Sequence, residues 1–278
     1  MTDLLLDCGG KPLDLSRPRI MGVLNITPDS FSDGGVFMDP GIAVERAQRM
    51  VGEGAAIIDV GGESTRPGAE PVPLEEELRR VIPVIEALGR RLRVPVSIDT
   101  RKPAVMQAAV AAGAGLINDV TALQAEGAVK AVADLGVPVC LMHMQGIPTS
   151  MQVSPHYDNV VSEVTEFLTG RAAVCIEAGI PRTRILLDPG FGFGKTVAHN
   201  LLLLRHLDHL VATGYPVLVG LSRKSLIGKV LELPVEKRLF PSVALATLAV
   251  WQGAAIVRCH DVRATREAIE MCAAVRNM

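Results

Sequence analysis

In "ILLDPGFGFGKT" (185–196), an apolar, strand-like run leads into glycines and then Gly-Lys-Thr. The fold class depends on whether this stretch is a P-loop or another loop that follows a strand. A nucleoside-triphosphate P-loop also follows a strand, and its pattern is Gly-x-x-x-x-Gly-Lys-Ser/Thr. Counting back five positions from Gly194 leads to Pro189, where that pattern needs glycine. Proline lacks an N–H group and has a fixed φ, so the first turn of a phosphate-binding backbone would be lost. The stretch therefore indicates a different ligand site after a strand.

The same order of strand, turn and helix recurs along the whole chain. Helical periodicity lies between the strand-like runs, as in Glu75–Leu92, where acidic residues come first and arginines last. The other expected helices are 43–53, 103–112, 158–178, 199–213 and 262–275, with a short helical run at 226–231. The expected strands are 20–26, 56–60, 94–98, 116–120, 138–143, 185–188, 216–221 and 255–260. Eight such alternations predict an α/β fold, a TIM (β/α)8 barrel, rather than a doubly wound sheet.

The length of 278 residues favours one domain, so we expect a single barrel domain over residues 1–278. Within residues 1–18, the segment Leu4–Leu15 is expected to form a small hairpin that caps the barrel floor. The core is expected to consist of aliphatic side chains, since 49% of the residues are hydrophobic and only 3% are aromatic.

Charge and cysteine usage exclude several classes of protein. A net charge of -2 provides no basic surface for nucleic acid. The five cysteines are scattered without a Cys-x-x-Cys pair, which argues against disulfides and zinc. The charge-free stretch Ser242–Val257 is shorter than the about 20 residues that span a bilayer and is interpreted as a buried helix followed by a strand. No signal peptide opens the chain, so we expect a cytoplasmic protein that acts on small molecules.

The barrel predicts an active site at the carboxyl ends of its strands. Nearly every predicted strand ends in a polar residue, and although a single one could be a helix cap, eight at one end predict a binding site. These residues are Asn25, Asp59, Asp99, Asn118 with Asp119, Met142 with His143, Asp188, Ser222 to Ser225, and Arg258 with His260.

Two of these acids suggest the shape of the ligand. Asp99 and Asp188 can each accept two parallel hydrogen bonds from adjacent N–H groups, and Asn118 can both donate and accept. Met142 and Phe193 suit the faces of a flat ring, with ordinary core packing as the alternative. The set predicts a pterin or guanine-like ring.

Longer motifs then become recognisable. In order along residues 19 to 262 they are "MGVLNITPDSFSDGG" (21–35), "IIDVGGESTRPGA" (57–69), "SIDT" (97–100), "INDV" (117–120), "CLMHMQG" (140–146), "LLDPGFGFGK" (186–195), "GLSRKSLIG" (220–228) and "VRCHD" (257–261). The chain closely resembles the dihydropteroate synthase family. The resemblance implies a transferase of folate biosynthesis that condenses 6-hydroxymethyl-7,8-dihydropterin diphosphate with 4-aminobenzoate and releases pyrophosphate.

The resemblance also implies roles for residues at the matching positions. Pterin binding would fall to Asp99, Asn118, Met142, Asp188, Phe193 and Lys224; the diphosphate to Asn25, Arg66, Arg258 and His260; and aminobenzoate to Thr65, Pro67 and Ser225. Asn25 is the expected ligand of a Mg²⁺ cofactor. Phe31 and Asp33 would act from a loop (28–40) that closes over the site with loop 64–73. Asp33, Phe31, Arg66, Lys224, Arg258 and His260 form the expected catalytic set.

The expected mechanism is an SN1-like displacement, in which the cationic groups and Mg²⁺ stabilise the departing pyrophosphate. The resemblance further implies a homodimer and competition by sulfonamides for the aminobenzoate site. Ser225 also starts a helical run, so a plain N-cap is its alternative role. Asp59 and Glu63 are interpreted as structural, and His206 with His209 as a solvated helix face rather than a metal site.

Three other functions remain open at this point. A pterin-binding barrel for corrinoid-dependent methyl transfer would share the Asp and Asn positions but should lack the "ESTRPG" and "SRKS" stretches. An inactive pterin-binding paralogue would not need the basic residues for the diphosphate. A P-loop NTPase is the third alternative.

Overall fold

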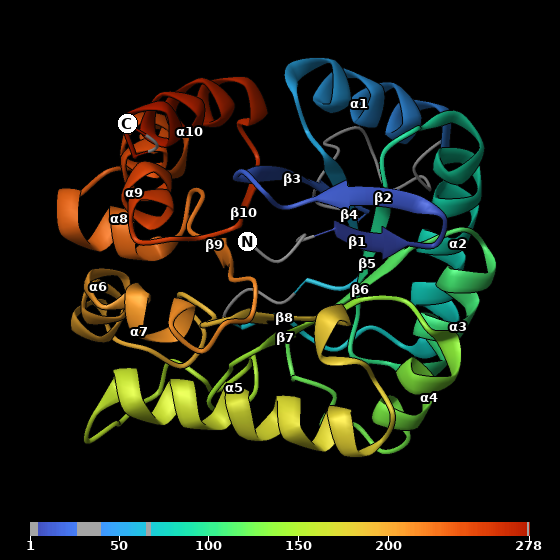
Figure 1. Ribbon diagram of the computed structural model, residues 1–278, viewed down its shortest axis with the longest axis horizontal. Coiled ribbons are helices and arrows are strands. Elements are labelled where there is room, and N and C mark those ends of the chain that lie inside the picture. Colours follow the sequence, from blue (N-terminus) through green and yellow to red (C-terminus); the bar gives the residue numbers. More distant parts are fainter. Residues whose placement is uncertain (1–4, 27–39, 65–67, 277) are drawn as a thin grey trace.

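The computed structural model describes residues 5–26, 40–64, 68–276 and 278, and these form an α/β barrel (Figure 1). Parallel strands neighbour one another in the order β8-β7-β6-β5-β4-β3-β10-β9, and a parallel bridge from Leu187 to Val217 joins the two ends. The strands are β3 (Arg19–Asn25), β4 (Ile57–Gly61), β5 (Val96–Asp99), β6 (Leu116–Asp119), β7 (Val139–Met142), β8 (Ile185–Asp188), β9 (Leu218–Gly220) and β10 (Ile256–Cys259). Each overlaps one of the eight predicted strands, and the expected TIM barrel is confirmed.

Helices surround this barrel (Figure 1). They are α1 (Pro40–Glu53), α2 (Leu74–Arg91), α3 (Pro103–Ala111), α4 (Ala128–Leu135), α5 (Val160–Glu177), α6 (Val197–Arg205), α7 (Leu207–Val211), α8 (Ser225–Leu231), α9 (Leu239–Trp251) and α10 (Val262–Arg276). The prediction of one helix over 199–213 is wrong, because His206 has a non-helical φ of -115° and separates α6 from α7. Helix α4 was not among the predicted helices.

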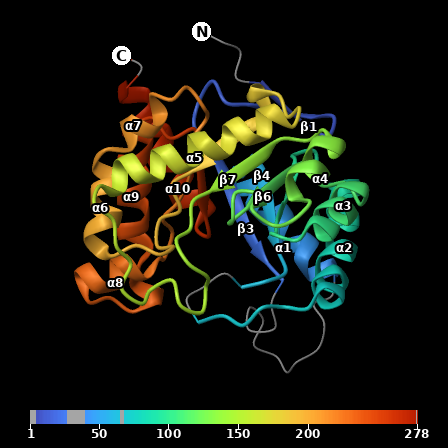
Figure 2. The same cartoon turned by 90° about the horizontal axis from the view of Figure 1, so that it is seen from below.

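An antiparallel hairpin of β1 (Leu5–Cys8) and β2 (Lys11–Asp14) covers one end of the barrel, and the strands run away from it (Figure 2). Its buried side chains, such as Leu6 and Leu13, cluster with one apolar residue from most strands, including Ile57, Leu116 and Ile256. Gly115 permits the close approach, because a Cβ there would lie 2.1 Å from the carbonyl oxygen of Cys8. This end of the barrel is therefore a dry floor.

Polar residues begin one layer above that floor. Side chains alternate along a strand, so the residue two positions after each floor residue faces the barrel interior again. That second layer contains Val23, Asp59, Asn118, Met142, Asp188, Gly220 and Arg258. The larger apolar core, which includes Val60, Ile98 and Ile117, lies on the other face of the strands, against the helices. Polar side chains thus converge inside the barrel near the carboxyl ends of the strands.

Candidate active site

Four residues lie in one row across adjacent strands, namely Asn25, Gly61, Asp99 and Asn118, and we call them the acceptor row. Asn25 pairs in register with Gly61, Gly61 with Asp99, and Asp99 with Asn118. A Cβ on Gly61 would lie 3.7 Å from both Asn25 Oδ1 and the Cβ of Asp99. Glycine therefore keeps open the space between these side chains. Gly61 was not among the predicted site residues, although it ends a strand beside two of them.

Arg258 reaches across the barrel from β10 and joins two of the acids. Its Nε donates to Asp59 Oδ2 at 2.6 Å, and its Nη2 donates to Asp99 Oδ2 at 2.9 Å. Asn118 Nδ2 donates to the same Asp59 Oδ2 at 3.2 Å. Within the described ranges, no group donates to Asp99 Oδ1 or Asn118 Oδ1, and both atoms are buried. The site thus offers these two acceptors to N–H groups of a ligand, and Asp59 Oδ1 is a further buried oxygen without a donor among the described residues.

Burial shapes the charges of this row. It raises the pKa of Asp99 to about 7, against the opposing effect of the Arg258 charge. Burial alone would lower the pKa of Arg258, but the carboxylates of Asp59 and Asp99 raise it, so the guanidinium stays charged. Asp59 and Asp99 are therefore two acids held by one permanently charged group, Arg258. Asp99 titrates near neutral pH.

Asp188, Phe193 and Lys224 form the opposite side of the site. Lys224 Nζ lies 4.3 Å from the centre of the Phe193 ring and donates to the carbonyl oxygen of Phe191. Burial lowers the pKa of Lys224 to about 8, although Asp188 acts in the other direction. Asp188 accepts from Gly190 N at 2.7 Å, and burial raises its pKa. Met142 is buried and follows the floor residue Cys140 by two positions, so it faces the same interior.

The glycine-rich loop after β8 is held by Lys195, which sequence analysis did not select. Its Nζ contacts His143 Nδ1 at 2.8 Å and the carbonyl oxygens of Gly190 and Phe193 at 3.0 Å each. Burial lowers the pKa of Lys195 well below its ordinary value, and burial lowers the pKa of His143 to about 3. The lysine that imitates a P-loop thus satisfies carbonyl groups. Apart from the P-loop-like pattern around Lys195, nothing in the sequence indicated that this lysine would be buried.

His260 and Ser225 lie at the ends of β10 and β9. Ser222 Oγ lies 3.0 Å from His260 Nδ1, and Arg223 pairs with Asp261 with its Nε 2.9 Å from Oδ2. Helix α8 begins at Ser225 after Lys224, so Ser225 occupies the first helical position and the N-cap alternative is wrong. Its side chain is exposed and available to a ligand.

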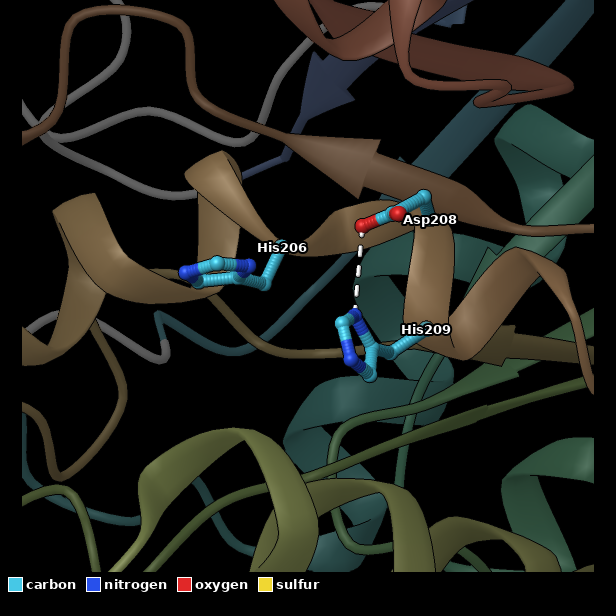
Figure 3. Close-up of side chains that lie close together, drawn as sticks. All are labelled: His206, Asp208 and His209. Atoms are coloured by element: carbon cyan, nitrogen blue, oxygen red, sulfur yellow. Dashed lines mark hydrogen bonds and ion pairs between the residues drawn. The ribbon is translucent and has the colours of Figure 1, made fainter.

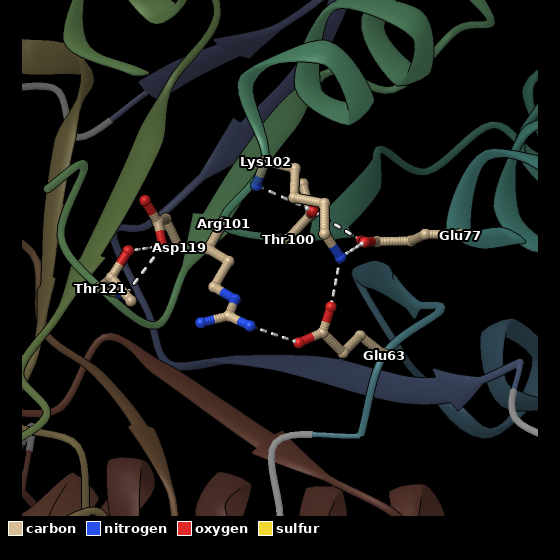
Figure 4. Close-up of polar contacts among 7 residues, drawn as sticks. All are labelled: Glu63, Glu77, Thr100, Arg101, Lys102, Asp119 and Thr121. Atoms are coloured by element: carbon tan, nitrogen blue, oxygen red, sulfur yellow. Dashed lines mark hydrogen bonds and ion pairs between the residues drawn. The ribbon is translucent and has the colours of Figure 1, made fainter. Parts of the chain in front are cut away.

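An ion network lies beside the site and holds Glu63, two residues after the end of β4 (Figure 4). Lys102 lies between Glu63 and the fully buried Glu77, which also accepts from Thr100 Oγ1 at 2.6 Å. Arg101 donates to Glu63 at 3.0 Å. These contacts occupy Glu63 with structural partners. Asp119 is likewise occupied, because it accepts from the backbone N–H groups of Thr121 and Leu123 at 2.8 Å each.

Five predicted site residues lie outside the described residues. They are Phe31, Asp33, Thr65, Arg66 and Pro67. Of the remaining predicted residues, the barrel brings Asn25, Asp99, Asn118, Met142, Asp188, Phe193, Lys224, Ser225, Arg258 and His260 to its carboxyl end.

One group of three side chains in the described part of the chain combines metal-ligand types, namely His206, Asp208 and His209 (Figure 3). Their ligand atoms lie within 4.8 Å of one another, and His209 Nδ1 is 3.3 Å from Asp208 Oδ1. Asp208 and His209 are exposed on the short helix α7. We assign no cofactor site to this group, since exposed groups of this kind are common without a metal.

No helix in the described ranges is long and apolar enough to cross a membrane.

Comparison with known proteins shows which class of protein this chain belongs to. The profile described as "Pterin binding enzyme" matches residues 21–260, so the chain belongs to the pterin-binding enzymes. The chain is 52% identical over 262 residues to dihydropteroate synthase of Escherichia coli (strain K12), covering 94% of this chain and 93% of that protein. It is 50% identical over 272 residues to dihydropteroate synthase of Haemophilus influenzae, covering 98% and 99%. The chain therefore belongs to the dihydropteroate synthase family.

Solved structures agree with this assignment. Xanthomonas albilineans dihydropteroate synthase with 4-aminobenzoic acid superposes with a TM-score of 0.94 at 54% identity and full coverage of both chains. A sulfonamide complex of the Yersinia pestis enzyme gives 0.94 at 51% identity, covering 99% of this chain and 100% of that one. The Xanthomonas albilineans enzyme in complex with 7,8-dihydropteroate gives 0.89 at 51% identity, covering 99% of each.

Proposed function

We propose that this chain condenses 6-hydroxymethyl-7,8-dihydropterin diphosphate with 4-aminobenzoate, forming 7,8-dihydropteroate and pyrophosphate. The observation that carries the proposal is the pair of buried acceptors, Asp99 Oδ1 and Asn118 Oδ1, which have no donor among the described residues. A buried oxygen without a partner is costly, and the amino and ring N–H groups of a pterin would satisfy both atoms. Membership of the family supplies the two substrates.

The pterin ring is assigned to the space between the acceptor row and Lys224. Asp99, Asn118 and Asp188 bind its polar edge, and Lys224 contributes a cation beside the ring. Met142 and Phe193 pack on its faces. Phe193 already carries the Lys224 ammonium group over its ring, so a bound pterin extends an existing stack.

The diphosphate is assigned to Arg66, Arg258 and His260. Asp59 and Asp99 take two of the five N–H donors of Arg258, which leaves others for phosphate oxygens. Asn25 Oδ1 lies beside Gly61 in the acceptor row, and a carboxamide oxygen suits Mg²⁺, which needs few protein ligands when phosphates and water supply the rest. When bound, Mg²⁺ neutralises charge on the departing pyrophosphate.

Aminobenzoate is assigned to Ser225, Thr65 and Pro67. Ser225 is exposed at the first position of α8, where its hydroxyl group can donate to a carboxylate. Sulfonamides would compete at the same place, as the Yersinia pestis complex suggests. The reaction itself is an SN1-like displacement, in which Arg66, Arg258 and His260 stabilise the leaving group while Phe31 and Asp33 exclude water from the cation. Lys224 completes the catalytic set beside the ring.

A homodimer is proposed from the outer surface of α9 and α10, which lie side by side (Figure 1). Leu248 and Trp251 on α9, with Met271 and Val275 on α10, are exposed at spacings of three and four residues. Such spacing produces an apolar stripe on each helix. A stripe on each of two packed helices suits a second copy of the chain. A cytoplasmic location is proposed from the five cysteines, all described, all buried and all free.

The test is pyrophosphate release from the pterin diphosphate in the presence of Mg²⁺, with and without 4-aminobenzoate. We expect release that requires aminobenzoate and a kcat/KM that falls by about 10- to 100-fold in Asn118→Ala, the loss expected for one unmet hydrogen bond. Asp134→Asn, at an exposed ion pair with Lys130, is the control and should have no effect. Pterin binding without release would contradict the proposal and indicate an inactive relative. Release at an equal rate with and without aminobenzoate, with no 7,8-dihydropteroate formed, would contradict it as well.

A further inference from the structure

Asp59 is buried at the centre of the site, yet it has no part in the proposed substrate contacts. It is 0% exposed, and its Oδ2 accepts both from Arg258 Nε at 2.6 Å and from Asn118 Nδ2 at 3.2 Å. One carboxylate oxygen on β4 thereby joins side chains from β6 and β10. Asp59 follows the floor residue Ile57 by two positions, so it shares the second layer with Asn118 and precedes Gly61 by two positions on β4.

The contact with Asp59 decides which end of the Asn118 amide faces the ligand. An ionised carboxylate only accepts hydrogen bonds, so the Asn118 NH₂ group must face it. The reverse orientation would place the Asn118 carbonyl oxygen against a carboxylate oxygen, two acceptors with no proton between them. Asn118 Oδ1 consequently faces away from Asp59, and it has no donor in the described part of the chain.

The same carboxylate acts on Asp99 through Arg258. Arg258 is held from one side by Asp59 and donates from Nη2 to Asp99 Oδ2 at 2.9 Å. That bond occupies one oxygen of Asp99 and leaves Oδ1 as the second buried acceptor. Asp59 accepts directly from Asn118 and holds Arg258, which donates to Asp99. The two atoms of the row that are left for the ligand, Asp99 Oδ1 and Asn118 Oδ1, are therefore both acceptors.

We propose that Asp59 is a positioning residue that sets the hydrogen-bond polarity of the pterin pocket, by turning the carbonyl oxygen of Asn118 toward the ligand and thereby selecting ring edges made of N–H donors. This inference rests on the proposed function, because it names the ligand edge that the same site selects. The competing role for Asp59 is only to balance the buried charge of Arg258.

Two substitutions separate these roles. Asp59→Asn removes the charge but keeps an oxygen that can accept from Asn118 and Arg258. Asp59→Leu keeps the branching at Cγ in a somewhat larger side chain and removes the acceptor, so the Asn118 amide is free to turn. The readout is the ratio of dissociation constants for two ligands, a pterin and the pteridine-2,4-dione in which an oxo group replaces the 2-amino group. A charge-balancing role would change both affinities together and leave their ratio unmoved.

We expect wild type to bind the dione about 10- to 100-fold more weakly than the pterin, the range for one unmet hydrogen bond. Asp59→Asn should retain that ratio, and Asp59→Leu should lower it by at least about tenfold, since a turned Asn118 amide can donate to the oxo group. An unchanged ratio in Asp59→Leu would overturn the inference. A decrease of the same size in the ratio for Asp59→Asn would overturn it as well. If wild type binds no pterin at all, the proposed function itself fails, which is a separate result.

A second measurement keeps the inference open to refutation if Asp59→Leu does not fold. The side-chain amide protons of Asn118 can be assigned in the ¹⁵N spectrum of the wild-type protein by their loss in Asn118→Ala. We expect one of the two protons, the one that donates to Asp59, to exchange slowly and to change little on saturation with pterin. Large downfield shifts of both protons on saturation would show that neither is held by Asp59 and would refute the proposed orientation.

Discussion

The proposed pterin contact of Asp99 predicts that pterin binding is sensitive to acid. Burial raises its pKa to about 7, and its unpaired oxygen accepts from the ligand only while the carboxylate is ionised. Protonation replaces an acceptor by an O–H donor that faces the N–H groups of the ring. We therefore expect the affinity for a pterin without diphosphate to fall below pH 7, approaching tenfold per pH unit, as measured by isothermal titration calorimetry.

The proposed pterin contact of Lys224 predicts a limit to binding on the alkaline side. Burial lowers its pKa to about 8, so above that pH the ammonium group over Phe193 loses its charge. Affinity should then be greatest between about pH 7 and pH 8. Asp99→Asn should abolish the acid dependence and leave the alkaline one, whereas Lys224→Arg should do the reverse, because arginine stays protonated. A profile that is flat from pH 5 to pH 9 in the wild type would contradict both assignments.

At the scale of single residues, the predictable part of the site was the part that ends strands. Asp99, Asn118 and Asp188 stand where apolar runs stop, and the barrel brings such positions together. Asp59 was also placed near the end of a predicted strand, but it was interpreted as a structural residue, and in the structure it lies two positions before the end of β4. Its importance depends on a contact with Arg258, which is 199 residues away in the sequence. No local pattern records a pairing of that separation.

The loop after β8 depends on glycine at a position where two backbones meet. Gly190 has a φ of +67°, and a Cβ there would lie 1.9 Å from the carbonyl oxygen of His143. Gly190→Ala should lower the free energy of unfolding by roughly 3 kcal/mol, from backbone strain and overpacking together. It should also weaken pterin binding, because the N–H group of Gly190 holds Asp188.

Gly170→Ala is the matched control for this substitution. Gly170 lies in the middle of α5 with nothing within 4 Å of its missing Cβ. Alanine there should raise the free energy of unfolding by about 0.5–1 kcal/mol. Urea unfolding of the two variants measures both effects. Equal stabilities for the two variants would show that the close approach of Gly190 to His143 does not exist.

At the scale of elements, periodicity located the strands well and the short helices poorly. α4 has only eight residues between two glycines with positive φ, too few turns for a clear apolar period. The break at His206 depends on the backbone conformation of a single residue, which periodicity over a longer window averages out. The N-terminal hairpin was easier to predict, since its apolar residues alternate and Gly9 and Gly10 form its turn.

For the molecule as a whole, the barrel turns eight local patterns into one site. Neighbouring strands are also neighbours in the sequence, apart from the closure of the ring, so their polar ends meet without long connections. The hairpin closes the opposite end with apolar side chains, which directs ligands to the carboxyl ends. The outer surface of α9 and α10 differs from the barrel interior, because its apolar side chains are more than half exposed.

That surface leads to the last prediction, on assembly. Leu248, Trp251, Met271 and Val275 are 53%, 54%, 66% and 60% exposed. If two copies bury this surface against each other, a charge in its centre would lose water without gaining a partner. Trp251→Glu and Met271→Glu should each raise the dissociation constant of the dimer at least about 100-fold, as measured by sedimentation velocity.

The control is Val174→Glu on α5, which lies on another side of the barrel and is 40% exposed (Figure 1). It should sediment as the wild type does, because the same change in charge occurs away from the proposed interface. Wild-type protein that sediments as a single chain at micromolar concentration would refute the dimer. A dimer that persists in both α9 and α10 variants would refute this surface, since two like charges brought together at a two-fold axis repel as well as desolvate.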